Sequence, residues 1–168
     1  MTSAHQSATI GPTPRSWGLL GVRHRMQLIG FSIAEDFIAV VRGDDRFDLH
    51  NNFDFQSMSY APTQRTLELH WRRGTGSWVK ASDPPALSLS FSGVYLFKAK
   101  ERDPELPFTE DDCLDTIGFM WDDLVAEMLA FSSNRPTKGR THFIANFVSG
   151  FSIKVGATSA TLRVSGGA

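Results

Sequence analysis

Two histidines and an aspartate carry the side chains best suited to acid–base chemistry or ligand binding. His50 and His70 lie on either side of Asp54 in a stretch of alternating polar and apolar residues. An imidazole and a carboxylate can share a proton or bind a metal only when they lie within a few ångströms of one another. The spacing of His50 and Asp54 matches no recognised ligand pattern, and ordinary solvated residues are the simpler interpretation. We therefore treat His50, Asp54 and His70 as an alternative ligand site on the open face of the strands that carry them.

The acidic residues are concentrated in one segment. Residues 101–127 contain ten acids and one base, a net charge of −9, whereas residues 128–168 contain five bases and no acid. The two segments can neutralise each other across the fold, or the acidic segment can present an anionic face to a basic partner. The second hypothesis makes four carboxylates the candidate partner-binding residues: Glu110, Asp111, Asp112 and Asp115.

Cys113 lies inside this acidic segment, where neighbouring carboxylates should raise the pKa of its thiol and make it a poor nucleophile. Asp111, Cys113 and Asp115 have the spacing of a calcium loop, but cysteine occupies the third position and Thr116 stands where glycine is required. The sequence also lacks the P-loop, dinucleotide-binding, nucleophile-elbow and zinc-protease motifs. These observations favour a packing role for Cys113 and a protein that is not an enzyme, with no catalytic residues, metal or cofactor.

The whole chain has the composition of a soluble globular domain. It has 168 residues, of which 41% are hydrophobic and 21% charged, with 17 bases, 18 acids and one cysteine. The near balance of charge gives no uniform field for nucleic acid or an anionic membrane, and no apolar run approaches the roughly 18 residues of a membrane-spanning helix. A single cysteine excludes an internal disulfide framework. We expect a cytoplasmic protein that binds neither nucleic acid nor membrane.

The elements that carry the histidines are predicted from the hydrophobic pattern. Ser32 begins a capping box and Gly43 can end a helix, so a helix is expected over residues 33–42, with a strand over residues 37–41 as the alternative. Two stretches with a period of two follow, on either side of a turn at Pro62. They predict an antiparallel hairpin of residues 53–60 and 67–72 with Asp54 and His70 on its open face.

The elements after the hairpin include the one expected to carry the acidic residues. A bulged strand is expected over residues 86–98, with its phase changing at Gly93. Thr109 has the residue type of an N-cap, and three carboxylates follow it, which predicts a short helix that ends before Gly118. A second helix is expected over residues 122–131. The chain then closes with three strand-like runs, residues 143–148, 151–155 and 158–164.

Together these elements predict an α+β fold with about six mostly antiparallel strands and two or three short helices. Residues 1–27, rich in Ser, Thr, Pro and Gly, are expected to form a flexible N-terminal tail, and residues 28–168 a single α+β domain. Two other interpretations of the first residues stay open, an organelle transit peptide and a translation start at Met26.

Three stretches of the chain carry a resemblance: FDLHNNFDFQSMSYAPTQRTLELHW, LSLSFSGVYLF and FVSGFSIKVGATSATLRV. They resemble small, β-rich bacterial proteins of unknown function, some of which are grouped with toxin-immunity proteins. The resemblance covers about half the chain, with Gly93-Val94 and Ser149-Gly150 steps, and brings no catalytic residues. It implies a non-enzymatic protein that binds and blocks a toxin, with the acidic segment as the contact for a basic nuclease. A homodimer that buries an exposed sheet face is an alternative assembly.

Overall fold

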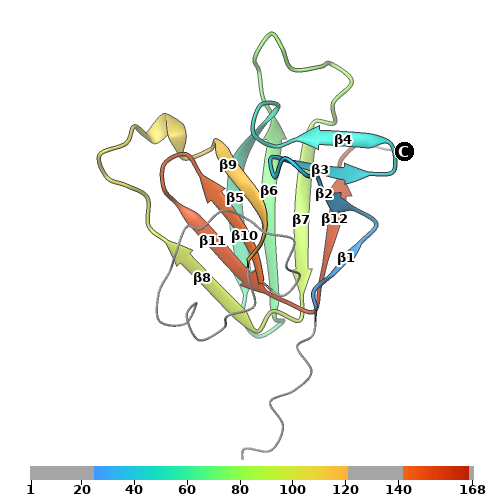
Figure 1. The fold of residues 1–168 in the computed structure, drawn as a ribbon, viewed down its shortest axis with the longest axis vertical. Coiled ribbons are helices and arrows are strands. Elements are labelled where there is room, and N and C mark those ends of the chain that lie inside the picture. The colour runs from blue at the N-terminus through green and yellow to red at the C-terminus, as the bar shows by residue number, and fades with distance from the viewer. Residues whose placement is uncertain (1–24, 121–141, 167–168) are drawn as a thin grey trace, which may run out of the picture.

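The computed structural model describes residues 25–120 and 142–166, which form twelve strands in three sheets and one short 3-10 helix (Figure 1). The five-stranded sheet has the order β1 (Gln27–Ile29), β12 (Ser159–Val164), β7 (Ala86–Ser92), β6 (Thr66–Arg73), β5 (Phe53–Ala61). The four-stranded sheet has the order β8 (Leu96–Lys100), β11 (Ser152–Gly156), β10 (His142–Phe147), β9 (Leu114–Met120). The three-stranded sheet contains β2 (Ser32–Ile33), β3 (Ala39–Arg42) and β4 (Asp45–Asp48). All paired strands are antiparallel except β1 and β12, which are parallel.

The two large sheets pack face to face as a β-sandwich, with the four-stranded sheet in front in Figure 1. Alternate residues of each sheet point inward, so the rings of Phe91 on β7 and Phe143 on β10 meet across the interface at 4.9 Å. Each large apolar side chain buried in this way contributes about 1.5–3 kcal/mol to folding. The core therefore lies between the two sheets, and it fixes the strand ends from which the functional loops extend.

The small sheet crosses one end of the sandwich beside β9 (Figure 1). The amide of Ile117 on β9 donates to the carbonyl of Phe37 at 2.6 Å, and Phe37 lies in the turn between β2 and β3. This turn replaces the predicted helix over residues 33–42, so the strand alternative was closer. Phe37 has φ of +60°, which a helix does not allow, and Gly43, with φ of +60°, forms the β3–β4 turn instead of a helix end.

The α+β class predicted from the sequence is wrong, because the described residues contain a three-residue 3-10 helix and otherwise only strands and loops. The predicted helix after Thr109 is replaced by the 3-10 helix η1 (Phe108–Glu110) and by β9. Leu114 and Ile117 of β9 are fully buried in the core, and this burial outweighs the local helix signal. The second predicted helix, residues 122–131, lies outside the described residues.

The segment predicted as one bulged strand over residues 86–98 is two strands in different sheets. Gly93 adopts φ of +66° after β7, and the chain then crosses from the five-stranded sheet to β8 in the four-stranded sheet. Two backbone hydrogen bonds hold the crossing, from Val94 to the Arg65 carbonyl and from Tyr95 to the Gly156 carbonyl, both 2.9 Å. This corner points β8 toward the acidic segment.

The hairpin and the three closing runs, which were predicted from a period of two, are confirmed as strands. β5 and β6 form the expected hairpin, and β10, β11 and β12 match the three closing runs. The hairpin contains a register shift between Phe55 and Ser57, which the sequence analysis did not predict. This shift reverses the phase of β5. The sequence pattern placed Ser57 and Ser59 on the same face as Phe55, but in the structure it is Met58 that pairs with the buried Leu69.

Two further features concern the ends and the outer face of the domain. Met26, only 2% exposed, and Gln27 in β1 belong to the folded domain, which therefore begins before residue 28.

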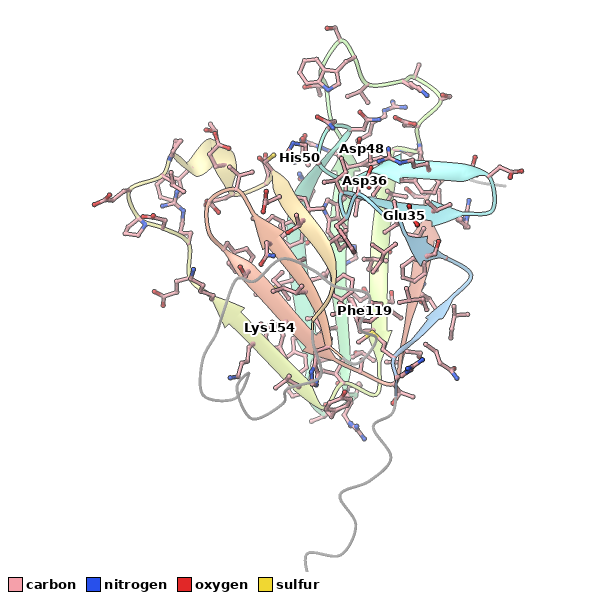
Figure 2. The ribbon with its side chains drawn as sticks, in the orientation of Figure 1. Glu35, Asp36, Asp48, His50, Phe119 and Lys154 are labelled. Atoms are coloured by element: carbon pink, nitrogen blue, oxygen red, sulfur yellow. The ribbon has the colours of Figure 1, made fainter. Side chains whose placement is uncertain are left out.

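Ile144 and Lys154 pair across β10 and β11, and both side chains are fully buried although they alternate with the core residues Phe143 and Ile153 (Lys154 is labelled in Figure 2). Within the described residues no helix is both long and apolar enough to cross a membrane.

Candidate functional site

The acidic segment begins as a loop, residues 101–113, which we call the acidic loop; it joins β8 to β9 through η1. Backbone hydrogen bonds attach it to the turn between β10 and β11. The amide of Asp103 donates to the Ser149 carbonyl at 2.7 Å, and the amide of Ser149 donates to the Glu110 carbonyl at 3.2 Å. The loop stands at one end of the sandwich (Figure 1), and these bonds give it a defined position there.

Arg102 organises the interior of the acidic loop. Its Nε donates to Oδ1 of Asp111 at 2.8 Å, its guanidinium also donates to the Leu106 carbonyl, and it lies over the Phe108 ring at 4.3 Å from the centroid. The hydrogen bond from Arg102 holds the pKa of Asp111 below its usual range. The one base of the acidic loop is therefore already paired, and it fixes an aromatic ring beside a carboxylate.

Asp112 brings the acidic loop against the first residues of β5. Its carbonyl accepts a hydrogen bond from the Phe55 amide at 2.8 Å. Partial burial raises the pKa of the Asp112 carboxyl, and repulsion from Asp54 on β5 raises it further. Two carboxylates from distant parts of the sequence thus lie close enough to repel each other.

A pocket of about 670 Å³ lies between the acidic loop, β5 and the β10–β11 turn. Its apolar wall includes Phe55 and Phe151, which both contact Phe147 with ring centroids 4.6 and 5.2 Å apart. The remaining described lining is Gln56, Glu101, Arg102, Pro104, Phe108, Asp111 and Asp112. Three carboxylates thus face one guanidinium that is already paired, and we call this site the acidic pocket.

Phe108 is the most exposed aromatic side chain of the pocket. Phe108 is 79% exposed. The Arg102 guanidinium already lies over this ring, and an aromatic ring beside carboxylates can hold a further cation by a cation–π contact together with ion pairing. The pocket can therefore accept a side chain with an apolar stem and a positive end.

The four carboxylates predicted from the sequence do not share one role. Asp111 and Asp112 line the acidic pocket, Glu110 is half-buried in η1, and Asp115 is exposed on β9 outside the pocket lining. The sequence analysis did not identify the aromatic residues of the site or Arg102. The signal for Phe108 was an apolar pair, Leu106 and Phe108, among the prolines and acids of a loop.

His50 makes a structural contact in the described fold. Its Nδ1 lies against the Leu114 carbonyl; because a carbonyl only accepts, Nδ1 carries the proton. The Cys113 Sγ lies 3.9 Å from the same nitrogen, so that nitrogen cannot take the thiol proton. Burial, followed by repulsion from Glu110 and Asp112, raises the pKa of the Cys113 thiol, in the direction that the sequence predicted.

The structure does not assemble the alternative ligand site. Asp54 pairs with Arg72 across the hairpin, whereas His70 pairs with Ser57, so the two lie at different positions along the sheet face. The Nε2 of His70 lies 3.4 Å from Glu68, and His50 is directed toward β9. Of the three residues, His50 contacts Cys113 at the end of the acidic loop and Asp54 lies near Asp112, whereas His70 makes no such contact within the described residues.

Comparison with known proteins adds no relative, since no family model, curated protein or solved structure matches the chain. The described residues also contain no group of three or more His, Cys, Asp or Glu side chains placed to hold a metal ion. The function is therefore argued from the acidic pocket itself.

Proposed function

We propose that the protein is a non-catalytic binding protein of the cytoplasm that recognises a basic segment of another protein at the acidic pocket. The observation that carries this proposal is Phe108, 79% exposed, in the lining of a pocket with three carboxylates. A few aromatic and arginine side chains that become buried on binding dominate the binding energy of protein interfaces.

The chemistry of the pocket favours a lysine or arginine of the partner. The Phe55 and Phe151 rings offer an apolar wall for the methylene stem, while Glu101 and Asp112 offer carboxylates for the charged end. An incoming cation would relieve the repulsion between Asp112 and Asp54. The free energy of binding is more favourable because this repulsion is present in the free protein. The resemblance to proteins grouped with toxin immunity suggests a basic toxin as the partner.

The experiment compares what three proteins capture from native lysate: the wild type, a pocket variant and a control variant. Glu101→Lys with Asp112→Lys reverses two exposed carboxylates of the pocket. Asp44→Lys with Asp45→Lys makes the same change of charge on the exposed β3–β4 turn and serves as the control.

The proposal expects a basic protein that the wild type and the control variant retain and that the pocket variant loses. The captured protein is then purified and its dissociation constant measured against all three. Equal affinity for the wild type and the pocket variant would refute the role of the pocket. Loss of binding in both variants would show a dependence on net charge alone.

A further inference from the structure

The edge strands of the two large sheets differ in how they are protected from pairing with another strand. Proteins protect an edge by keeping its strand short, by placing lysines on it or by covering it. β1 has three residues, and β8 carries Lys98 and Lys100. The Ile117 amide on β9 donates to the Phe37 carbonyl, which covers the middle of that strand. The remaining edge strand, β5, has nine residues and carries no charged side chain from Phe55 to Ala61.

The acidic loop covers only the first part of β5. The Phe55 amide donates outward to the Asp112 carbonyl at 2.8 Å, and a register shift follows between Phe55 and Ser57. Among the described residues, no other backbone hydrogen bond is formed on the outer side of this strand. Residues 57–61 therefore form an open strand edge, which we call the β5 edge.

The hydrogen bonds of β6 decide which residues of the β5 edge face outward. The Arg73 amide donates to a carbonyl beside β7 at 2.9 Å, and backbone groups alternate in direction along a strand. Counted along β6, the backbone groups of Glu68 therefore face β5, where Glu68 pairs with Ser59. The N–H and C=O groups of Met58 and Tyr60, on either side of Ser59, then point away from β6 and can pair with another strand.

The side chains of Met58 and Tyr60 are apolar surface left open at this edge. They are 39% and 40% exposed, although Met58 pairs with the buried Leu69 and the Tyr60 ring contacts the Phe97 ring with centroids 4.8 Å apart. Both side chains thus lie on the core side of the sheet. A further strand paired with β5 would bury more of their apolar surface.

The β5 edge is complementary to itself. When two copies pair antiparallel about a two-fold axis at Ser59, Met58 of each copy lies opposite Tyr60 of the other, and their outward backbone groups meet as a hydrogen-bonded pair. A methionine sulfur beside an aromatic ring is a favourable contact. The residue on the axis, Ser59, is small and uncharged, so the centre brings no like charges together.

The charges at the two ends of the β5 edge favour the same arrangement. Gln56, in the lining of the acidic pocket, lies near Pro62 of the second copy, and the turn that begins at Pro62 ends at Arg65. The carboxylates of each copy thus approach a base of the other. A second copy of the chain therefore matches this edge in backbone phase, in apolar side chains and in charge.

We propose that the β5 edge is a dimer interface at which two copies of this chain join their five-stranded sheets into one continuous sheet. The inference does not depend on the function proposed for the acidic pocket. The register shift after Phe55 and the turn at Pro62 limit the paired length, so the dimer is a reversible one.

The first test is sedimentation equilibrium of the full chain from about 1 μM to about 1 mM. The wild type is expected to pass from monomer toward dimer over this range. A monomer at every concentration would overturn the proposal and leave the β5 edge to a strand of another protein.

Three variants locate the interface. Met58→Lys places a charge on the inner face of the edge strand, and Met58→Pro removes an amide that β6 does not use. Each should weaken the dimer at least about tenfold, and Met58→Lys decides alone if Met58→Pro does not fold. Ile29→Lys makes the same change at an exposed residue of β1, the opposite edge of the same sheet, and should alter the dimer less than about twofold. A dimer that survives Met58→Lys, or that Ile29→Lys weakens equally, would overturn the proposed interface.

Amide hydrogen exchange tests the strand pairing itself. The Met58 and Tyr60 amides should exchange slowly at the highest protein concentration and fast at the lowest, because they are hydrogen-bonded only in the dimer. The Ser59 amide, which faces β6, should be protected at both concentrations. Unchanged exchange at Met58 and Tyr60 in a dimeric sample would show that another surface forms the dimer.

Discussion

At Gly93 a single added methyl group would meet both a strained backbone and a close neighbour. Its φ of +66° lies in the left-handed region, and a Cβ built there would lie 2.4 Å from Oγ1 and 3.0 Å from Cβ of Thr158. Thr158 can rotate its hydroxyl away, but its Cβ is held because its amide donates to the Ser92 carbonyl at 3.0 Å. Gly93→Ala therefore introduces both backbone strain and a steric clash.

Gly43 supplies the matched comparison. It has φ of +60°, and a Cβ built there meets nothing within 4 Å, so Gly43→Ala introduces the backbone strain alone. That strain costs about 1–2 kcal/mol, and overpacking adds about 1–3 kcal/mol. Gly93→Ala should therefore lower the free energy of unfolding by about 2–5 kcal/mol and Gly43→Ala by about 1–2 kcal/mol.

Urea unfolding followed by tryptophan fluorescence measures both variants at one pH and temperature. The double variant Gly93→Ala with Thr158→Ala removes the nearest clashing atom and should recover at least about 0.5 kcal/mol relative to the sum of the single changes. If Gly93→Ala destabilises no more than Gly43→Ala, the close approach of Thr158 to the corner between the sheets is wrong. The placement of β8 and the acidic loop would then lose its support.

Three further predictions concern titratable groups. Asp48 accepts hydrogen bonds from the amides of His50 and Asn51 at 3.1 and 2.9 Å; desolvation opposes its ionisation, but these bonds and Arg46 outweigh it and lower its pKa. Asp48→Ala should therefore cost about 1 kcal/mol at neutral pH, and urea unfolding should show this difference fading as pH falls below 3.8, the usual pKa of Asp48, and through the lowered pKa of the folded state. A difference that stays constant through that range would contradict the assignment. Asp112 has the opposite sign, since burial and Asp54 raise its pKa, so wild-type stability is lost as pH rises from 3.8 through the raised value; Asp112→Asn should remove that loss and unfold at higher urea at pH 7. A less stable Asp112→Asn protein at pH 7 would rule this out. Cys113, with its raised thiol pKa, should react with iodoacetamide at pH 7.5 more slowly than free cysteine does, and a faster reaction would show an activated thiol.

The sequence predicted the strands that alternate regularly and missed the elements decided by distant contacts. Residues 53–60 and 158–164 alternate with a period of two, and both are strands. Thr109 and the acids after it carry a local helix signal, but pairing of β9 with β10 overrides it. The change of sheet at Gly93 depends on contacts with Arg65 and Gly156, which no local pattern records.

The candidate site was predicted only in part, because some of its residues come together through contacts between distant parts of the chain. Counting charges was enough to select Asp111 and Asp112, because a local excess of acids is visible in the sequence. The aromatic wall was not, because Phe55 and Phe151 come together only through the packing of β5 against the β10–β11 turn. The site is thus a local charge pattern combined with a tertiary contact.

The most direct test of the central claim is the dissociation constant of the captured basic partner, measured by titration calorimetry against three proteins. The account predicts that Glu101→Lys with Asp112→Lys weakens binding at least about tenfold, a loss of about 1.4 kcal/mol, while Asp44→Lys with Asp45→Lys changes it less than about twofold. Equal weakening by the two variants, or none by the first, would contradict the claim that the acidic pocket is the binding site.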